Sequence, residues 1–574
     1  MTTETFFANF GHLADAPNGV KRLRELILQL AVQGRLVPQD PEDEPASVLL
    51  DRIEAEKKRL VEKGKIKKLT TAEPVKGEEQ PFAAPQGWKW PRLNSICSYI
   101  QRGKGPQYVD KSDVPVVSQK CVQWAGFSLA PARFICPMSL DKYAEERFLQ
   151  TGDLLWNSTG TGTIGRINVY VHEENPYELV VADSHVTVVR PVFVNSRYVW
   201  IWLASPFIQA DLEGNASGST NQVEMATSVV KAHVIPLPPL EEQKRIVAKV
   251  DQLMTLCDEL ETRQKKQQQG KVRLNNAALD KLLTAREPVE FADHWQRIST
   301  NFDLLYDHPE TIAKLRAAIL QLAVQGKLVP QDPNDEPAEV LLERIRAEKE
   351  RLVKNVTARK SILPSHIKKS EHPFLLPAGW TWVRLGDFGL FLGGGTPSKQ
   401  NPSFWSGEIP WVSPKDMKVQ NISDSIDHVS QEAVDNSSAK LIPEGALLMV
   451  VRGMILLHSF PVAKTVREVT INQDMKALIC ALPEISEYLL RSLIAEKVRI
   501  LDRVERSSHG TCRLESDKLS EFVVALPPLA EQKRIVAKVD QLMSQCDELE
   551  TKLNQAQQRS DKLMNATVRQ LLVA

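Results

Sequence analysis

The chain has 574 residues, of which 42% are hydrophobic and 25% charged, and its 72 basic residues balance its 72 acidic residues. This composition is ordinary for a soluble globular protein with several domains, and the zero net charge gives no global indication of nucleic-acid binding. The N-terminus has no signal-peptide pattern, the richest apolar run is interrupted by Arg452, and the seven cysteines include no CxxC pair. We therefore expect a cytoplasmic protein rather than a secreted, membrane-spanning or zinc-stabilised one.

The first predicted element is a helical block that occurs twice. Residues 23–61 return as residues 315–353, with 31 of 39 positions identical, and each copy carries a QDP[EN]DEP turn followed by a helix. Next along the chain, GWKWPRL (87–93) returns as GWTWVRL (379–385). We interpret the tryptophans of these motifs as packing anchors rather than as base-stacking residues; they are Trp88, Trp90, Trp380 and Trp382.

Between the repeated blocks lie two inserts, residues 94–235 and 386–525, which share only sporadic similarity. They are rich in β-branched residues and in turns, so they predict strands, with short helices near residues 198–212 and 487–504. We call the repeated blocks on either side of the inserts the frame. Two copies of one frame can engage two copies of one partner, whereas two unlike inserts can recognise two unlike targets.

The first insert contains GTGTIG (160–165), which matches the dinucleotide fingerprint GxGxxG. That fingerprint needs a helix beginning within it, but the next residues, RINVYV, form a strand pattern, and Asp183 lies in another β run. The glycines therefore predict a tight turn between two strands. The chain also lacks GxxxxGK[ST], NPP[YF], HExxH and GxSxG, which disfavours a self-sufficient enzyme.

Each insert is followed by a predicted long helix. Residues 240–263 return as residues 529–552 with 20 of 24 positions identical, and Pro-Pro precedes each copy. The first helix is predicted over residues 240–283. Its apolar positions follow the 4-3-4-3 spacing of a coiled coil from Ile246 to Leu260, and the C-terminal copy continues it to Ala556.

The chain resembles the specificity subunit of a type I restriction-modification system over essentially its full length, because its segments follow the order frame, insert, frame, frame, insert, frame. The resemblance is carried by PLPPLEEQKRIVAKVD and ALPPLAEQKRIVAKVD, by the GWxW motifs, and by signatures within the inserts. Those signatures are RGKGPQY (102–108), GDLLWNSTGTGTIGRINV (152–169), GSTNQ (218–222), GGGTPSKQNPSFWSGEIPWVSPKDM (393–417), MVVRGMIL (449–456) and INQDMKAL (471–478). One departure is the N-terminal block, which is longer than the shortest family members require.

The resemblance implies an α+β fold with a pseudo-twofold repeat, in which long antiparallel coiled-coil helices separate two β-rich target recognition domains. The expected divisions are a helical region (1–84), the first recognition domain (85–236), a central region (237–376), the second recognition domain (377–526) and a C-terminal helix (527–574). Each recognition domain would read one half of a split, asymmetric DNA sequence. The alternative is a two-armed coiled-coil scaffold whose inserts bind a ligand other than DNA.

The resemblance also implies partners for host defence in a bacterial or archaeal cytoplasm. Two modification subunits would methylate adenine at N6 with S-adenosylmethionine, and two restriction subunits would use ATP and Mg²⁺, so this chain itself would be non-catalytic and hold no cofactor or metal. Residues 88–236 contain 13 basic and 13 acidic residues, and residues 380–525 contain 16 and 18. We therefore expect the isolated chain to bind DNA weakly, with phosphate contacts from clustered basic residues and from the modification subunits.

Candidate DNA-contacting residues are polar side chains in the signature turns, where Arg and Lys suit guanine and Asn and Gln suit adenine. The alternative is that these residues only reflect ordinary turn chemistry. In the first domain the candidates are Lys104, Tyr108, Gln119, Lys120, Asn157, Thr159, Thr161, Arg166, Ser219, Thr220 and Asn221. In the second they are Thr396, Ser398, Lys399, Lys415, Arg452, Gln473, Asp474, Lys476, His509, Thr511 and Arg513.

The duplicated motif LQLAVQG[RK]LVP supplies candidates for partner docking, because plain packing would tolerate more drift between the two copies. The alternatives are a helix C-cap at Gly34 and Gly326, and recent duplication or recombination. The candidate docking residues are Gln29, Gln33, Arg35, Gln325 and Lys327.

Overall fold

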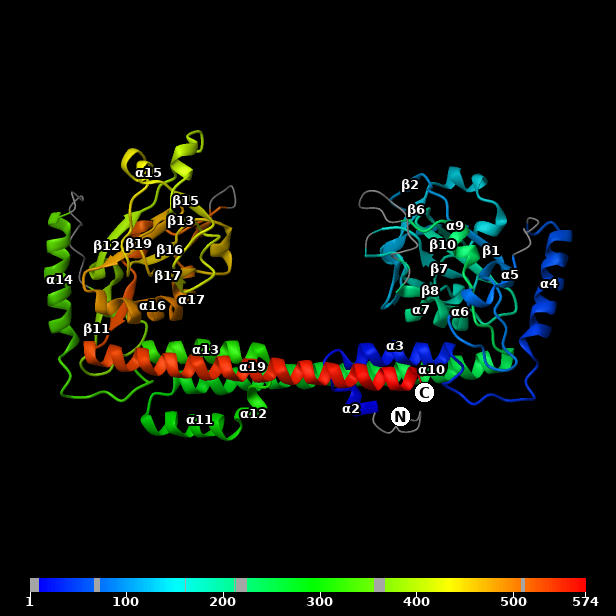
Figure 1. The fold of residues 1–574 in the computed structure, drawn as a ribbon, viewed down its shortest axis with the longest axis horizontal. Helices are drawn as coiled ribbons and strands as arrows, with labels where there is room; N and C mark the ends of the chain where they lie inside the picture. Colours follow the sequence, from blue (N-terminus) through cyan, green and yellow to red (C-terminus); the bar gives the residue numbers. More distant parts are fainter. Residues whose placement is uncertain are drawn as a thin grey trace. The chain divides into compact units, whose positions relative to one another are not determined.

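A computed structural model describes residues 10–66, 73–160, 162–210, 212, 224–355, 367–506 and 511–573. The chain forms two compact units: unit 1 comprises the residues up to 267 together with those from 556 onward, and unit 2 comprises residues 268–555. Each unit holds one insert and one copy of the duplicated frame (Figure 1). The internal repeat of the sequence is therefore also a structural division.

The frame of unit 1 begins with α3 (Gly19–Val32), which buries apolar residues at helical spacing. It ends at Gly34, whose φ of +68° allows the Arg35 amide to donate to the carbonyl of Leu30 at 2.9 Å. The helix C-cap, which the sequence left open as the alternative to partner docking, is thus present at Gly34. The other short helices of unit 1 are α2 (Phe10–Ala14), α4 (Ala46–Glu62), α5 (Leu93–Ile96), α6 (Ser196–Leu203), α7 (Pro206–Gln209) and α9 (Thr227–Ala232).

Unit 2 repeats this frame with α13 (Pro309–Val324) and α14 (Ala338–Asn355). Gly326 again has a φ of +68°, and the Lys327 amide donates to the carbonyl of Leu322 at 2.9 Å. The other short helices of unit 2 are α11 (Pro288–Thr300), α12 (Phe302–Leu305), α15 (Gln431–Asn436), α16 (Ser486–Ala495), α17 (Lys497–Leu501) and α18 (Ser516–Ser520).

The insert of unit 1 contains two four-stranded sheets and a small hairpin. The first sheet is antiparallel, in the order β1 (Cys97–Arg102), β10 (Val186–Pro191), β7 (Leu154–Asn157), β8 (Ile167–Val169). The second runs β2 (Tyr108–Val109), β6 (Arg133–Ile135), β3 (Pro115–Val117), β9 (Val181–Ala182), and its last pair is parallel. The hairpin joins β4 (Val122–Gln123) to β5 (Gly126–Phe127).

The insert of unit 2 has a five-stranded sheet and a three-stranded sheet. The first runs β12 (Gly389–Gly393), β19 (Met475–Cys480), β16 (Leu447–Val450), β17 (Val462–Thr465), β14 (Asn421–Ile422). The second runs β15 (Asp427–Val429), β13 (Ile409–Val412), β18 (Thr470–Ile471), with β13 parallel to β18. Two further pairs are β11 (Thr381–Arg384) with β22 (Val523–Leu526), and β20 (Glu505–Arg506) with β21 (Cys512–Arg513).

The two inserts share one topology although their sequences diverge. The order β1-β10-β7-β8 matches β12-β19-β16-β17, and the parallel pair β3/β9 matches β13/β18. In these parallel pairs Val117 lies opposite Ala182, and Val412 lies opposite Ile471. This register assigns equivalent positions in the two domains, which the sequence comparison could not do.

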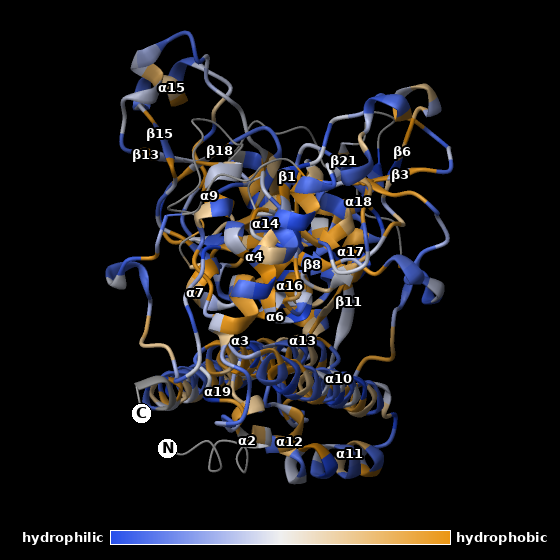
Figure 2. Ribbon diagram, turned by 90° about the vertical axis from the view of Figure 1, so that its right-hand side faces the viewer, coloured by the Kyte–Doolittle hydropathy of each residue, from blue (hydrophilic) through white to orange (hydrophobic). Residues whose placement is uncertain are grey.

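GTGTIG (160–165) connects β7 to β8, which pair antiparallel, so the predicted turn is confirmed. Gly160, Gly162 and Gly165 all have positive φ, and a side chain at Gly165 would meet Gln209 and Leu212 at 2.6 Å. The glycines therefore serve a compact strand-to-strand turn. Hydrophobic residues gather in the interior strands and in α6 and α16, as the colours of Figure 2 show.

Two helices contribute to both units: α10 (Leu240–Thr284) and α19 (Leu529–Val573), which agree with the predicted long helices. Their buried positions begin with the predicted seam at Ile246, Val250, Leu253 and Cys257. Farther along α10 the repeat of the buried and partly buried positions changes from seven to eleven residues. Gln268 and Leu279 follow Cys257 at this longer interval.

A similar change occurs in α19. Ala556, predicted as a seam residue, is exposed, whereas Met564 is buried. Leu542, Leu553 and Met564 are all at least partly buried at intervals of eleven residues. An eleven-residue repeat gives about 3.67 residues per turn, close to that of a straight helix. The predicted heptad positions from Ile246 to Leu260 and from Ile535 to Leu553 are at least partly buried, so the heptad prediction was wrong only at Ala556.

The GWxW motif of each frame meets the EQKR motif at the start of the long helix. The indole Nε1 of Trp88 donates to the buried carboxylate of Glu242 at 2.8 Å, and Trp380 donates to Glu531 at 2.9 Å. Burial raises the pKa of both glutamates, although the indole donors lower it. These contacts confirm that Trp88 and Trp380 are packing anchors, and they explain why two motifs about 150 residues apart are repeated together.

We expect Trp88→Phe to lower the free energy of unfolding by about 2–3 kcal/mol, because it leaves the buried Glu242 carboxylate without its indole donor. The loss would be measured by urea denaturation of the purified chain. The matched control is Trp295→Phe, since Trp295 is 41% exposed, and its effect should stay within about 0.5 kcal/mol. Equal effects of the two substitutions would contradict the anchoring role.

Candidate nucleic-acid interface

In unit 1 four loops meet where strands of the two sheets end. They are the loop after β1, the turn after β3, the GTGTIG loop (160–165) after β7, and the short turn between β9 and β10. The amide of Lys104 donates to the carbonyl of Ala182 at 3.0 Å, which joins the first loop to the fourth. The amide of Ser158 donates to the carbonyl of His185 at 2.9 Å, which joins the third to the fourth.

We call the place where these four loops meet the loop junction, and side chains add further hydrogen bonds to it. Nε2 of Gln119, from the turn after β3, donates to the carbonyl and the hydroxyl oxygen of Thr159 at 2.7 and 2.5 Å. The same hydroxyl lies 2.7 Å from Nδ1 of His185. Arg166 hydrogen-bonds to Gln123 of the β4–β5 hairpin and to the carbonyl of Gly162. Gln119, Thr159 and Arg166 were candidates from the sequence, and the fold brings them together from separate segments.

Asn157 fixes the same junction from inside. Its side chain is fully buried, and Nδ2 lies 3.3 Å from the carbonyl of Gln119 and 3.2 Å from that of Val122. Thr159 is also largely buried. Both side chains therefore lie below the surface, and in the fold they hold the loops of the junction in position. Lys104 and Lys120 are exposed.

Tyr108 lies beneath Arg133, whose guanidinium carbon is 3.9 Å from the ring centroid. Burial, together with the nearby Asp183 carboxylate, raises the pKa of Tyr108 to about 12, so this phenol stays protonated and can donate a hydrogen bond. Burial likewise raises the pKa of Asp183, whose carboxylate accepts a hydrogen bond from the amide of His185 at 2.8 Å.

Unit 2 builds the equivalent junction with different side chains. The amide of Gly395 donates to the carbonyl of Ile471, and the amides of Val451 and Arg452 donate to the carbonyl of Asp474. Nη1 of Arg452 lies 3.9 Å from a carboxylate oxygen of Asp474. The loops that carry the candidates after β12, β16 and β18 thus also meet in the second domain.

The other candidates of unit 2 surround this junction. Thr396 hydrogen-bonds to Gln473, and Arg452 forms a β-bridge with Arg513. Burial lowers the pKa of Lys476, which lies half-buried in β19. The exposed candidates are Ser398, Lys399, Lys415, Arg452, Gln473, Thr511 and Arg513. Five candidates of the two domains lie outside the described residues: Thr161, Ser219, Thr220, Asn221 and His509.

The candidate docking residues are only partly exposed. Nζ of Lys327 donates to the carbonyls of Leu283 and Ala285 at 2.7 and 2.9 Å, so it caps the end of α10, and burial lowers its pKa. Buried Oε1 atoms of Gln33 and Gln325 have no hydrogen-bond partner in the described structure. Gln29 and Arg35 are half-exposed.

Sequence reasoning missed several residues that hold the junctions. Arg102 pairs with Glu224 and donates to the carbonyl of Met225 at 3.1 Å, which ties the end of β1 to residues near the end of the insert. Asp183 and Asn472 occupy equivalent positions, since their amides donate to the carbonyls of Val117 and Val412 at 2.9 and 3.0 Å. The available signal was the Asx residue that follows a short apolar strand in both ADSH and INQD.

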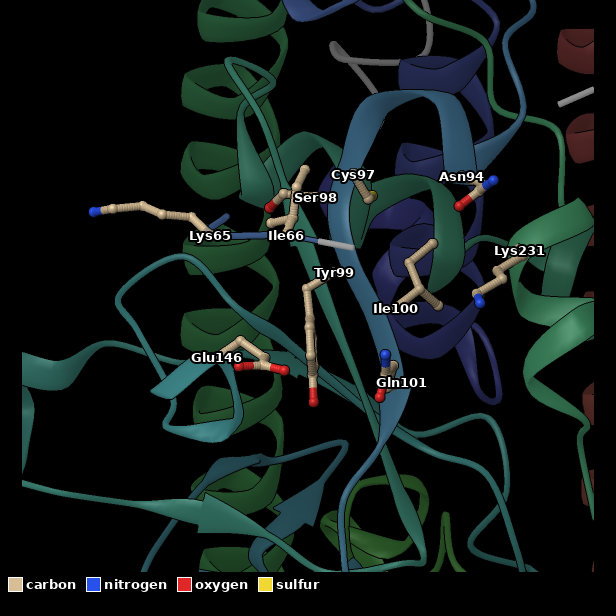
Figure 3. Close-up of a pocket in the computed structure, with 10 residues that line it drawn as sticks. All are labelled: Lys65, Ile66, Asn94, Cys97, Ser98, Tyr99, Ile100, Gln101, Glu146 and Lys231. Carbon is tan, nitrogen blue, oxygen red and sulfur yellow. The ribbon is translucent and has the colours of Figure 1, made fainter. Parts of the chain in front are cut away.

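A separate recess runs along β1 in unit 1 (Figure 3). Its lining mixes polar and charged groups, including Lys65, Glu146 and Lys231, with the fully buried Cys97. Burial raises the pKa of the Cys97 thiol, which keeps it protonated and unreactive. Across the residues that the structure describes, no group of three or more His, Cys, Asp or Glu side chains could hold a metal ion.

Comparison with known proteins identifies both inserts. The family model "Type I restriction modification DNA specificity domain" matches residues 85–268 and 377–558. The EcoAI type I restriction enzyme specificity subunit of Escherichia coli is 31% identical over 560 residues, covering 96% of this chain and 93% of the relative. The EcoEI specificity subunit of Escherichia coli is 32% identical over 573 residues, with the same coverage.

Among solved structures, the HsdS subunit from Thermoanaerobacter tengcongensis is 19% identical, with a TM-score of 0.40 over 86% of this chain and 98% of its own. A chain from a structure of a type I restriction-modification system is 20% identical, with a TM-score of 0.48 over 86% of this chain and 99% of its own. None of the helices in the described ranges has the length and apolarity needed to span a membrane.

Proposed function

Because the chain belongs to the specificity subunits of type I restriction-modification systems, we propose that it reads a bipartite, asymmetric DNA sequence, one half through each recognition domain. The first domain would use the exposed residues around the GTGTIG junction, and the second those around Arg452. Double-stranded DNA is the ligand that suits exposed Lys, Arg and Gln side chains presented on turns.

The observation that carries this proposal is the pair of equivalent loop junctions with different side chains. Thr159 and Arg452 occupy matching positions after β7 and β16, and His185 and Asp474 match before β10 and β19. One scaffold that varies its side chains at the loop tips suits a protein that must present two different sets of base contacts.

We propose that two modification subunits dock on the duplicated frame, and that restriction subunits join through them. The near-identity of the two frames supports this, because identical partners need identical surfaces. Gln29, Gln33, Arg35 and Gln325 remain candidates for this contact, whereas Lys327 has a structural role as the cap of α10. S-adenosylmethionine, ATP and Mg²⁺ would bind to the partners, and the complex would act in the cytoplasm.

The expected result is that the purified chain alone incorporates no methyl groups into DNA, because its role is recognition. Adding the modification subunit and S-adenosylmethionine should give N6-methyladenine at one split sequence. The assay is incorporation of radiolabelled methyl groups, followed by methylation-sensitive sequencing of the product. The control omits this chain and retains the modification subunit.

Methyl incorporation by this chain alone would contradict its non-catalytic role. Methylation by the complex without a bipartite motif would contradict recognition by two domains and would favour the scaffold alternative.

A further inference from the structure

The two ends of each insert are joined to each other by main-chain hydrogen bonds. In unit 1 the amide of Leu93 donates to the carbonyl of His233 at 2.7 Å, and in unit 2 the amide of Leu385 donates to the carbonyl of Phe522 at 2.7 Å. The donors end the duplicated motif GWxWxRL, and the acceptors lie shortly before the Pro-Pro pair of each long helix. We call this place, where the first and last residues of an insert meet, the neck.

A lysine from the frame holds the first residues of each insert. α4 and α14 each lie against the insert of their own unit (Figure 1). Nζ of Lys57, in α4, donates to the carbonyls of Asn94 and Ser95 at 2.7 and 2.8 Å, and Nζ of Lys349, in α14, donates to the carbonyl of Gly386 at 2.9 Å. The lysines share one position of the duplicated block, and Asn94 and Gly386 directly follow GWxWxRL. The same contact is therefore made in both units.

An arginine of each GWxWxRL motif holds the last residues of the insert. Nη1 of Arg92 donates to the carbonyl of Ala232 at 3.0 Å, and Nη1 of Arg384 donates to that of Glu521 at 2.9 Å. Each guanidinium also forms an ion pair with a glutamate 13 residues earlier in the chain, and both arginine side chains are largely buried. We call these arginines, together with the lysines of α4 and α14, the neck clamps.

The neck clamps bind the main chain of the insert rather than its side chains. Asn94 in the first insert is replaced by Gly386 in the second, yet the lysine contact is present in both. Every sequence provides main-chain carbonyls, so one frame can hold inserts that share only sporadic similarity. A hydrogen bond from a charged donor is about twice as strong as one between neutral groups, which makes such a contact specific in orientation without requiring a specific partner residue.

The neck clamps also lie at the base of the strands that lead to the loop junctions. β1 and β12 begin shortly after Asn94 and Gly386, and their far ends run into the loops that carry Lys104 and Thr396. A rotation of the insert about its neck would therefore displace the loop junction relative to the frame.

We propose that the neck clamps are positioning residues, which fix the orientation of each recognition domain on its frame and thereby the distance at which its half-site is read. A domain that turned to reach a displaced half-site would break the clamp bonds, so their strength contributes to the rejection of an incorrect spacer. This inference rests on the proposed function and adds to it frame residues that determine spacer selectivity without touching DNA.

The test measures methylation by the full chain in complex with its modification subunit. The duplexes carry both half-sites with the native spacer, or with one base pair added or removed. Lys57→Met keeps most of the apolar stem but removes the charged donor, so the preference for the native spacer should fall about tenfold. The preference for the correct bases within each half-site should stay unchanged, because the loop junctions are intact. Lys349→Met should give the same result through unit 2.

The matched control is Lys58→Met, which changes the next residue of α4. The side chain of Lys58 is 71% exposed and pairs with Glu54 within the same helix, so its loss should leave the spacer preference unchanged. A residue that served stability alone would lower methylation of all duplexes in proportion, whereas a neck clamp should change their ratio.

An unchanged ratio in both Lys57→Met and Lys349→Met, or a proportional loss on all duplexes, would overturn the inference while the proposed function stood. A complex that failed to assemble with either variant would count against it in the same way, and so would an equal change of the ratio in Lys58→Met. If the wild-type complex showed no preference for a bipartite motif, the proposed function would fall, and this inference with it.

Discussion

Exchanging residues 94–235 for the corresponding insert of a related specificity subunit should replace one half of the methylated sequence and leave the other half and the spacer unchanged. Each insert forms its own sheets, and its candidate readers come from loops of that insert alone. The measurement is methylation-sensitive sequencing of a host that carries the hybrid with its modification and restriction subunits.

The structure shows which contacts the donor insert must retain. Arg197 pairs with Asp251 of α10 at 2.9 Å, and the hydroxyl of Tyr198 donates to the carbonyl of Pro236 at 2.6 Å. Unit 2 repeats both contacts: Arg491 pairs with Asp540 of α19 at 2.6 Å, and Tyr488 donates to the carbonyl of Ala525 at 3.0 Å. The arginines come from different positions of the two helices, so a donor insert needs only a Tyr that reaches this carbonyl and an Arg that reaches this aspartate in order to seat on the frame.

The reciprocal exchange of residues 386–525 serves as the control and should change only the opposite half. A hybrid in which both halves change would show that the inserts do not read independently. A hybrid that loses all methylation but keeps the thermal stability of the wild type would argue that the inserts contribute to docking of the modification subunit.

Lengthening the long helices should change the spacer between the half-sites. Four residues inserted between Gln264 and Gly270 add just over one turn, or about 6 Å at about 1.5 Å per residue. That is close to two base pairs at about 3.4 Å each. If the helices set the distance between the recognition domains, the expected motif has a spacer longer by one or two base pairs, with both half-sites intact.

The position of the insertion matters because Gln264, at the start of this segment, is bonded to another part of unit 1. Nε2 of Gln264 donates to the carbonyl of Ala14 at 2.9 Å, whereas Lys265 and Lys266 are exposed. An insertion directly after Lys266 preserves the contact of Gln264. Because α19 also contributes to both units, a matching insertion after Gln555, which is exposed, should accompany it.

The single insertion in α10 is the informative control for the matched pair. It should reduce methylation more than the double insertion does, because α19 would keep its original length. The readout is the methylated-site motif of each variant in the complete complex. An unchanged spacer at full activity in the double variant would show that the modification subunits, or other frame contacts, set the distance.

The sequence by itself determined the architecture of this protein. Near-identical blocks at residues 23–61 and 315–353 predicted two frames, and apolar spacing after each Pro-Pro pair predicted the long helices almost to the residue. The reason is that helix periodicity, capping glycines and internal repeats are local signals, which depend on neighbours in the chain and survive without any tertiary information.

The tertiary structure decided which candidates lie at the surface. Asn157 looked like a base reader, but it is buried because its amide satisfies the carbonyls of Gln119 and Val122, residues about 35 positions away in the chain. Lys327 looked like a docking residue, but the end of α10 offers its ammonium two free carbonyls. Long-range hydrogen bonds of this kind leave no trace in local composition.

The equivalence of the two inserts also required the tertiary structure. Thr159 and Arg452 differ in chemistry, and only the register of β7 with β10 and of β16 with β19 aligns them. A sheet tolerates almost any apolar residue on its buried face, so two sequences can diverge while the backbone pairing persists. The sequence thus determined that there are two recognition modules, whereas the pairing of strands distant in the chain decided which side chains each module presents.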